Sequence, residues 1–422
     1  MNKGKITVSD IVSAEKILGI EYSKQEREQM MNDLEDQIIS AKTRRKSKFD
    51  NNVPTASKFD PRLPGFEMSN LTGLKISEKT YKCTISDEDI AFASVAAQGH
   101  WIKTKQITSR RLTEIYLDRI NKFQGQLNCY ANVTGELALA EADAMDLLTE
   151  DYISLGPLHG IPYGLKDLFD TKDIETAWGA EPYQNRLPLE DAEIVKRLRA
   201  AGAVLLGKTA VGALAYNDIW YGGRTKNPWN LNEGSSGSSA GSASATAAGL
   251  CSFAIGTETL GSITSPSERC GTTGLRPTFG RVSRTGCMAL CWSLDKIGPI
   301  CRSVEDTGLI LSIINGYDEN DRFSIKAPFH FDSEKATSDL KVGYIPDSFG
   351  PDATELDKDI LRVVSNLGFD VQAVELNKLP YSSLINILHA EAAASFEDLT
   401  LSNEDDTLAC LLYTSPSPRD RG

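Results

Sequence analysis

The sequence predicts an α/β fold: a mixed, twisted β-sheet sandwiched between layers of α-helices, preceded by a helical extension. Short apolar runs alternate with amphipathic segments along most of the chain, a pattern typical of a sheet covered by helices on both faces. The chain has 422 residues, enough to bury a sizeable core. Its composition, 41% hydrophobic and 24% charged, is that of an ordinary globular protein.

The N-terminal part differs from the rest of the chain. Residues 1 to about 45 are charged with spaced apolar positions, which predicts short helices, and the proline-containing stretch Asn51–Glu67 indicates a connector. The α/β pattern begins near Ile85. We therefore expect three parts: a helical extension and connector at 1–75, a main domain at 76–409, and a tail at 410–422.

Two segments of the main domain have the spacing of amphipathic helices. Thr108–Phe123 places its apolar residues on one side, and Glu190–Gly202 repeats this spacing before it ends at a glycine. A third helix is predicted at 355–368. The predicted strands that accompany these helices lie at 160–165, 203–207, 251–256, 341–345 and 369–376.

Composition argues against several classes of function. The net charge of −13 opposes general nucleic-acid binding, because phosphate is held by Lys and Arg, and the basic run Lys42–Asp50 is expected to be a solvated loop. The N-terminus lacks the apolar core of a secretory signal, and no window reaches the roughly 18 apolar residues that a membrane helix needs. We therefore expect a cytoplasmic protein that binds a small molecule, and neither nucleic acid nor a membrane.

Cysteine and histidine usage gives little material for a metal site. The eight cysteines form no CxxC pair, and the chain has four histidines, so a structural zinc site has few ligands to draw on. We expect reduced thiols and a reaction that needs neither a metal nor an organic cofactor.

Two short patterns match known motifs in the wrong context. Gly202–Thr209 fits the P-loop expression, but a P-loop needs a strand before its first glycine, and here a predicted helix precedes Gly202. Gly237–Gly241 fits G-x-S-x-G with Ser239 at its centre, but a nucleophile elbow follows a buried strand directly. A polar segment containing Pro228 precedes it instead, which disfavours an α/β-hydrolase.

Three other segments place polar side chains next to predicted strands. Lys166 follows a strand in "GLKD", the hydroxyls of "GSSAG" open a small-residue stretch, and Ser262 lies in the loop that leaves the next strand. We expect the Gly/Ser/Ala stretch to be a buried helix and not a flexible linker. These segments belong to five blocks, in order: "GPLHGIPYGLKD", "KNPWN", "GSSAGSASATAAGL", "AIGTETLGSITSP" and "GLRPTFGRVS".

In their order and spacing, the five blocks resemble the amidase signature family, which includes the A subunits of glutamyl-tRNA amidotransferases. The resemblance implies the fold stated above and a Ser–cisSer–Lys triad. In this triad Lys166 is the base, Ser238 is the bridging residue whose peptide bond is cis, and Ser262 is the nucleophile. It also implies an oxyanion hole made by backbone N–H groups of Thr259, Leu260, Gly261 and Ser262.

The chemistry explains why such residue types are needed. A serine hydroxyl is a weak nucleophile without a base, and an exposed lysine, with a pKa of about 10.4, is protonated and cannot be that base. Burial against apolar strands disfavours the ammonium form. A neutral Lys166 can then take the proton of Ser262 through Ser238 and return it to the departing amine.

The nucleophile segment departs from the family pattern G-G-S-I-R. Leu260 stands where a glycine is usual, Thr264 where an arginine is usual, and Glu258 where an aspartate is usual. A leucine held at positive φ would be strained. The departures leave the triad intact and bear on the geometry of the oxyanion hole and on substrate choice.

The sequence therefore predicts an amidase that hydrolyses a carboxylic amide to an acid and an amine or ammonia through an acyl-Ser262 intermediate. Two alternatives stay open: the glutaminase-type A subunit of a tRNA-dependent amidotransferase, and a catalytically inactive amidase-like binding protein. The expected partner is a small-molecule amide, and a homodimer is also left open.

The tail needs a separate interpretation. It follows an acidic helical segment abruptly, and Cys410–Asp420 resembles one reading frame of a transposase adapter used in sequencing libraries. We interpret 410–422 as non-native and expect the natural protein to continue beyond about Ala409.

Overall fold

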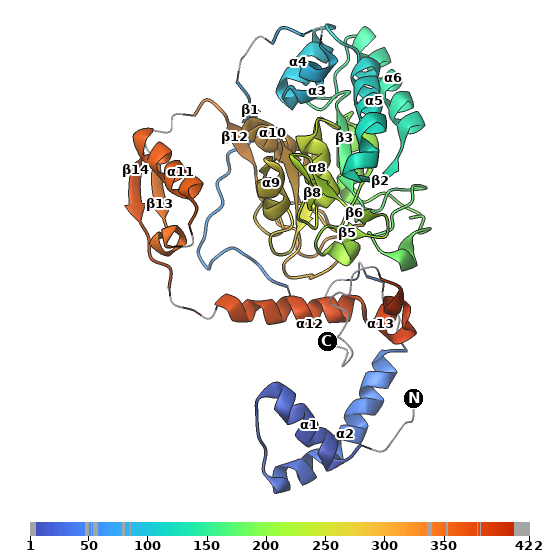
Figure 1. The fold of residues 1–422 in the computed structure, drawn as a ribbon, viewed down its shortest axis with the longest axis vertical. Coiled ribbons are helices and arrows are strands. Elements are labelled where there is room, and N and C mark those ends of the chain that lie inside the picture. Colours follow the sequence, from blue (N-terminus) through green and yellow to red (C-terminus); the bar gives the residue numbers. More distant parts are fainter. Residues whose placement is uncertain are drawn as a thin grey trace. The chain divides into compact units, whose positions relative to one another are not determined.

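A computed structural model describes residues 6–46, 50–51, 53, 58–77, 81–84, 86–335, 340–351, 353–377, 379 and 381–408. The chain forms two compact units, residues 1–53 and residues 54–422 (Figure 1). The interpretation of 410–422 as a non-native tail falls outside the described residues.

The first unit contains two helices, α1 (Val8–Leu18) and α2 (Lys24–Arg44). A capping box between Thr7 and Asp10 starts α1, and Gly19, at φ 66°, ends it. The guanidinium of Arg27 donates to both carboxylate oxygens of Glu15, at 2.8 and 2.6 Å, and so joins the two helices. Short helices were predicted for this part of the chain.

The second unit is built on a mixed six-stranded sheet in the order β10-β11-β9-β3-β4-β2. The central strand β3 pairs in parallel with β4 and with β9, whereas β2, β10 and β11 join antiparallel to their neighbours. This confirms the predicted mixed sheet. The strands are β2 (Tyr130–Val133), β3 (Pro162–Lys166), β4 (Val204–Thr209), β9 (Phe253–Glu258), β10 (Thr273–Gly274) and β11 (Lys296–Cys301).

Helices pack around this sheet (Figure 1): α5 contacts β3 and β4, α6 contacts β4, α8 contacts β9 and β11, and α10 contacts β11. The helices of this unit are α3 (Asp87–Phe92), α4 (Val95–Lys103), α5 (Ser109–Leu127), α6 (Gly135–Glu150), α7 (Glu193–Ala200), α8 (Ala240–Ala247), α9 (Thr264–Cys270), α10 (Val304–Ile314), α11 (Glu355–Asn366), α12 (Ile385–Ser395) and α13 (Glu397–Ser402).

In the described part of the chain, eight short strands form four pairs outside the main sheet. The predicted strand–helix–strand segment near the end of the chain is β13-α11-β14, in which the two strands are parallel. The pairs are β1 (Gly73–Lys75) with β12 (His330–Asp332), β5 (Ile219–Trp220) with β6 (Gly223–Arg224), β7 (Lys226–Asn227) with β8 (Asn230–Gly234), and β13 (Lys341–Tyr344) with β14 (Asp370–Ala373).

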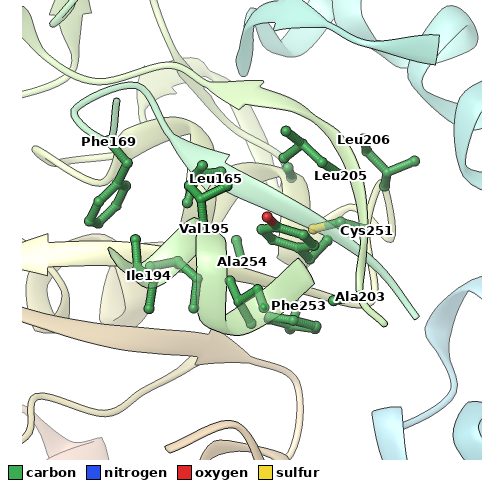
Figure 2. Packing of buried hydrophobic residues seen from close by; sticks show 14 of the residues in the cluster. Leu165, Phe169, Ile194, Val195, Ala203, Leu205, Leu206, Cys251, Phe253 and Ala254 are labelled. Carbon is green, nitrogen blue, oxygen red and sulfur yellow. The ribbon is translucent and has the colours of Figure 1, made fainter. Parts of the chain in front are cut away.

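The apolar core lies between the sheet and its helices. Figure 2 shows Ile194 and Val195 of α7 gathered in one cluster with Leu165 of β3 and Phe253 of β9. The ring of Phe253 stacks on Tyr163, with centroids 5.5 Å apart. The predicted apolar runs of the two central strands are thus buried, as is typical of strands covered on both faces.

The Gly/Ser/Ala stretch forms α8, every residue of which is buried. This confirms a buried helix in place of a flexible linker. Small side chains are required here: a Cβ at Gly241 would lie 2.1 Å from the carbonyl oxygen of Cys129 and 2.4 Å from the amide nitrogen of Ala210. The helix can therefore approach β4 closely only without side chains on that face.

The described part of the chain contains no helix that is both long enough and apolar enough to span a membrane. Its seven described cysteines are free, and six of them are buried.

The packing of α8 generates the first prediction. Gly241→Ala should destabilise the protein by about 1–3 kcal/mol, because the added methyl group overlaps backbone atoms that cannot move aside cheaply. The matched control is Gly125→Ala on α5, where a Cβ meets no atom within 4 Å and should stabilise the helix by about 0.5–1 kcal/mol. Thermal unfolding measures both. Equal melting temperatures for the two variants would contradict the packing described for α8.

Candidate active site

Lys166 ends strand β3 and is fully buried. Its Nζ atom lies 2.9 Å from Ser238 Oγ, 2.9 Å from Ser239 Oγ and 2.7 Å from Thr257 Oγ1. Among the described residues, no carboxylate lies within ion-pairing distance of this amine. Three hydroxyl groups and, at 3.4 Å, the backbone carbonyl of Thr257 surround it.

This environment shifts the protonation of the amine. Burial lowers the pKa of Lys166 to about 7, and the more distant Cys287, Asp295 and Glu258 oppose the shift only in part. A large fraction of the amine is therefore uncharged at neutral pH. This is the condition a lysine must meet before it can accept a proton.

Ser238 lies at the N-terminal side of α8, and its peptide bond with Gly237 is cis, the conformation implied by the family resemblance. The backbone N–H of Gly212 donates to the Ser238 carbonyl at 3.3 Å. A Cβ at position 237 would lie 1.8 Å from the carbonyl oxygen of Asn217, so only glycine fits before Ser238. The backbone around Ser238 is thus tightly enclosed.

Ser262 lies in the turn between β9 and α9 and lines a pocket of about 230 Å³. The backbone N–H of Ser239 donates to the Ser262 carbonyl at 3.1 Å, which ties the turn to the start of α8. The structure thus joins Lys166 to Ser238, and the neighbour of Ser238 to Ser262. Within the described residues, no hydrogen bond links the hydroxyls of Ser238 and Ser262.

The turn before Ser262 accommodates Leu260 without backbone strain. Gly261 takes the left-handed conformation, at φ 86°, whereas Leu260 is not among the described residues with positive φ. The leucine side chain is 68% exposed and lines the pocket together with Thr259. Replacing the usual glycine at 260 therefore changes the pocket wall and does not strain the turn.

Glu258 stabilises the same turn through hydrogen bonds. Its fully buried carboxylate accepts from the N–H groups of Ile263 and Thr264, both at 2.9 Å, and from Thr264 Oγ1 at 3.2 Å. Arg276 donates to the other oxygen at 3.0 Å. Burial raises the pKa of Glu258, but these donors outweigh burial and leave the pKa below its usual value. The two departures at 258 and 264 therefore bond to each other.

Sequence reasoning missed two residues of this site. It considered Ser239 as a nucleophile in a rejected motif and as a cap of the following helix, but not as a partner of Lys166, and it did not consider Thr257. Thr257 belongs to β9 and Lys166 to β3, and these strands pair in parallel. Because the carboxyl ends of parallel strands meet at one edge of a sheet, that pairing was the signal that could have placed Thr257 beside Lys166.

A second buried lysine, Lys208, has a different environment from that of Lys166. Lys208 Nζ lies 3.4 Å from Asp167 Oδ1 and donates to the Phe169 carbonyl at 2.7 Å and to Thr176 Oγ1 at 2.6 Å. It belongs to β4, so the P-loop match is part of a strand, as the sequence indicated. Lys208 has a carboxylate partner. Among the described residues, Lys166 has no carboxylate partner.

The strand before Ser239, β8, is largely exposed, so the context of a nucleophile elbow is absent there. Among the described residues there is no cluster of His, Cys, Asp or Glu side chains suited to a metal ion.

Comparison with known proteins places the chain in a family. The amidase family model matches residues 111–422. The A subunit of glutamyl-tRNA(Gln) amidotransferase from Geobacter sp. (strain M21) is 36% identical over 304 residues, which cover 70% of this chain and 62% of that protein. Its counterpart from Acaryochloris marina (strain MBIC 11017) is 37% identical over 68% of this chain and 62% of its own length. The matched region thus spans less than two thirds of these relatives.

Solved structures of similar fold support the same family. A structure described as an unexpected vestigial protein complex that reveals the evolutionary origins of an s-triazine catabolic enzyme superposes with a TM-score of 0.72 at 30% identity, covering 76% of this chain and 72% of that one. Native peptide amidase from Stenotrophomonas maltophilia superposes with a TM-score of 0.66 at 29% identity, covering 76% and 73%. On these motifs, this fold and these similarities, the chain belongs to the amidase family, the amidase signature family that its sequence blocks resemble.

Proposed function

We propose that this protein hydrolyses a carboxylic amide through an acyl-Ser262 intermediate, with Lys166 as the base and Ser238 as the proton bridge. The observation that carries the proposal is the fully buried amine of Lys166, which has no carboxylate partner among the described residues and lies 2.9 Å from Ser238 Oγ. A lysine desolvated in this way is available as a base at neutral pH.

Counting donors supports the direction of proton transfer. A neutral amine has two N–H groups and one lone pair. Ser239 Oγ donates its proton to the Thr257 carbonyl at 3.1 Å, so it can only accept from Lys166. Thr257 Oγ1, at 2.7 Å, accepts the second N–H. With both N–H groups used in this way, we assign the lone pair to the hydroxyl of Ser238, 2.9 Å away.

We assign the steps of the proposed reaction as follows. Ser262 Oγ attacks the amide carbon while its proton moves to Ser238 and the Ser238 proton moves to Lys166. The backbone N–H groups of Thr259, Leu260, Gly261 and Ser262 would stabilise the oxyanion. The carbon–nitrogen bond then breaks as Lys166 returns the proton through Ser238 to the departing nitrogen. Water cleaves the acyl-enzyme by the same proton path and releases the acid.

A second candidate function is that of the glutaminase-type A subunit of a tRNA-dependent amidotransferase. It is favoured by the two curated relatives described above, which carry that name at 36 and 37% identity. Those relatives are subunits of larger enzymes by name, and one structural neighbour is described as a complex. These similarities favour assembly with other chains and give no support to a homodimer.

The nucleophile is tested by labelling. Ser262→Ala should abolish reaction with a fluorophosphonate probe and lower amide hydrolysis on the order of 10³-fold or more, because it removes the hydroxyl on which the proposed acyl intermediate forms. Ser265→Ala is the control: that hydroxyl bonds Ser236 at 2.7 Å, and its loss should leave labelling intact. Failure of the folded wild-type protein to label would instead favour the inactive binding protein.

The base is tested by pH. The ammonium form of Lys166 cannot accept a proton, so kcat/KM should fall about tenfold for each pH unit below about 7, the pKa to which burial lowers this lysine. Lys166→Arg, which stays cationic, should be inactive at every pH. A profile that is flat from pH 5 to 8 would contradict Lys166 as the base.

The two functions are separated by their need for partners. The chain alone should release ammonia from a simple aliphatic carboxamide. Ammonia release from glutamine that appears only after addition of the other amidotransferase chains, with no activity of the chain alone on simple amides, would favour the second function. An enzyme-coupled ammonia assay measures both.

A further inference from the structure

We infer that the pocket beside Ser262 selects amides whose acyl group is small, uncharged and apolar, and that Leu260, Leu290 and Leu388 form the wall against which this group lies. The inference rests on the proposed acyl-Ser262 chemistry and adds a substrate class to it. All three leucines line the pocket that Ser262 also lines.

The lining carries no acidic or basic side chain. Among the described residues, those that line this pocket include no Asp, Glu, Lys, Arg or His. Its polar groups are hydroxyls, an amide and backbone atoms, which suit the amide to be cleaved. An acyl group with a carboxylate or an ammonium would therefore find no opposite charge to compensate its lost hydration.

Two charged side chains, Asp295 and Lys296, bond to residues of the pocket lining. Asp295 accepts from the Thr259 hydroxyl at 2.5 Å and from the N–H groups of Leu290 and Cys291 at 2.9 and 3.0 Å. Lys296 donates to the Thr259 carbonyl at 3.1 Å. These groups hold the pocket wall in place, and neither side chain lines the pocket.

Glu258 behaves in the same way, because its carboxylate faces the N–H groups of the turn and the guanidinium of Arg276. A zwitterion such as glutamine carries both a carboxylate and an ammonium, and would bring two uncompensated charges to this site. The charge distribution thus favours simple amides.

The leucines come from three separate elements: Leu260 from the turn after β9, Leu290 from the loop before β11, and Leu388 from α12. The last two elements are fixed to each other, because the Glu391 carboxylate on α12 accepts from the Ser293 N–H at 2.9 Å and from the Ser293 hydroxyl at 2.7 Å. The segments that carry Leu290 and Leu388 are therefore held together.

The pocket, at about 230 Å³, is smaller than the usual range of sites for drug-sized ligands, roughly 300–1,000 Å³. Its size suits an acyl chain of a few carbons.

Two amides of matched shape test the inference. In 4-methylpentanamide an isopropyl group stands where succinamate has a carboxylate, so the pair differs mainly in charge. We expect kcat/KM of the 422-residue protein to be at least 100-fold higher for 4-methylpentanamide, and glutamine to be at least as poor a substrate as succinamate. Hydrolysis of succinamate or glutamine at a rate within tenfold of 4-methylpentanamide would overturn the inference.

Charge variants sharpen the test. Leu260→Arg should reduce the preference for the neutral amide at least tenfold, because it brings a cation to the pocket rim. Leu367→Arg is the matched control: Leu367 is 69% exposed, against 68% for Leu260, lies at the end of α11 and does not line the pocket. An equal change in both variants would mean that surface charge alone causes the effect, and would contradict the assignment of Leu260.

Labelling separates this inference from the proposed function. If the fluorophosphonate probe does not label Ser262, the acyl-serine chemistry itself fails. If Ser262 is labelled, 4-methylpentanamide should slow the labelling and succinamate at the same concentration should not. Equal protection by the two amides would overturn the substrate class while leaving the nucleophile in place.

Should Leu260→Arg fail to fold, Leu260→Ala gives the same information. It should lower kcat/KM for 4-methylpentanamide several-fold more than that for succinamate. Equal losses for the two amides would contradict apolar contact at this position.

Discussion

The site depends on one constraint: an amine buried at the end of β3 without any carboxylate beside it among the described residues. A lysine on the neighbouring strand β4 has the carboxylate partner that Lys166 lacks. Lys208 of β4 pairs with Leu165 in the sheet register, one residue before Lys166, so the two lysines point to opposite faces. Lys208 meets Asp167, while Lys166 meets only hydroxyls and a carbonyl. A carboxylate beside Lys166, on the opposite face of the sheet from Asp167, would favour the charged form of this lysine.

Solvating an amine with hydroxyls demands close packing around it. The hydroxyls come from β9 and from the residues before α8, so these elements must approach β3 within hydrogen-bonding distance. A Cβ at Gly256 would lie 2.7 Å from Ser239 Oγ. Glycine at 256 therefore leaves room for the Ser239 hydroxyl that contacts the amine. Burying this amine reduces stability. In the unfolded chain Lys166 has its ordinary pKa of 10.5, and in the folded chain its pKa is about 7. Because the unfolded chain binds more protons between these values, the stability of the fold rises with pH across this range.

Much of this could be predicted from local sequence. The helix expected at 108–123 is α5, that at 190–202 contains α7, and the run at 251–256 overlaps β9, because hydrophobic spacing within one element sets its type. The contacts that place Ser239 and Thr257 on Lys166 join residues more than 70 positions apart, and no periodicity reports them. The hydrogen bond between Glu258 and Thr264 joins residues close in sequence. It could not be predicted without knowing that the turn folds back over the end of β9.

The carboxylate under the nucleophile turn has a consequence for acid exposure. A carboxyl group whose folded pKa lies below its unfolded value stabilises the fold above that unfolded value, 4.5 here, and this contribution is lost only as pH falls through the folded pKa. Lys166 takes up its proton much earlier, near 7. Between these two values Lys166 would be protonated while the Glu258 carboxylate still accepts from the turn, so the proposed activity would fall before this contribution to stability is lost.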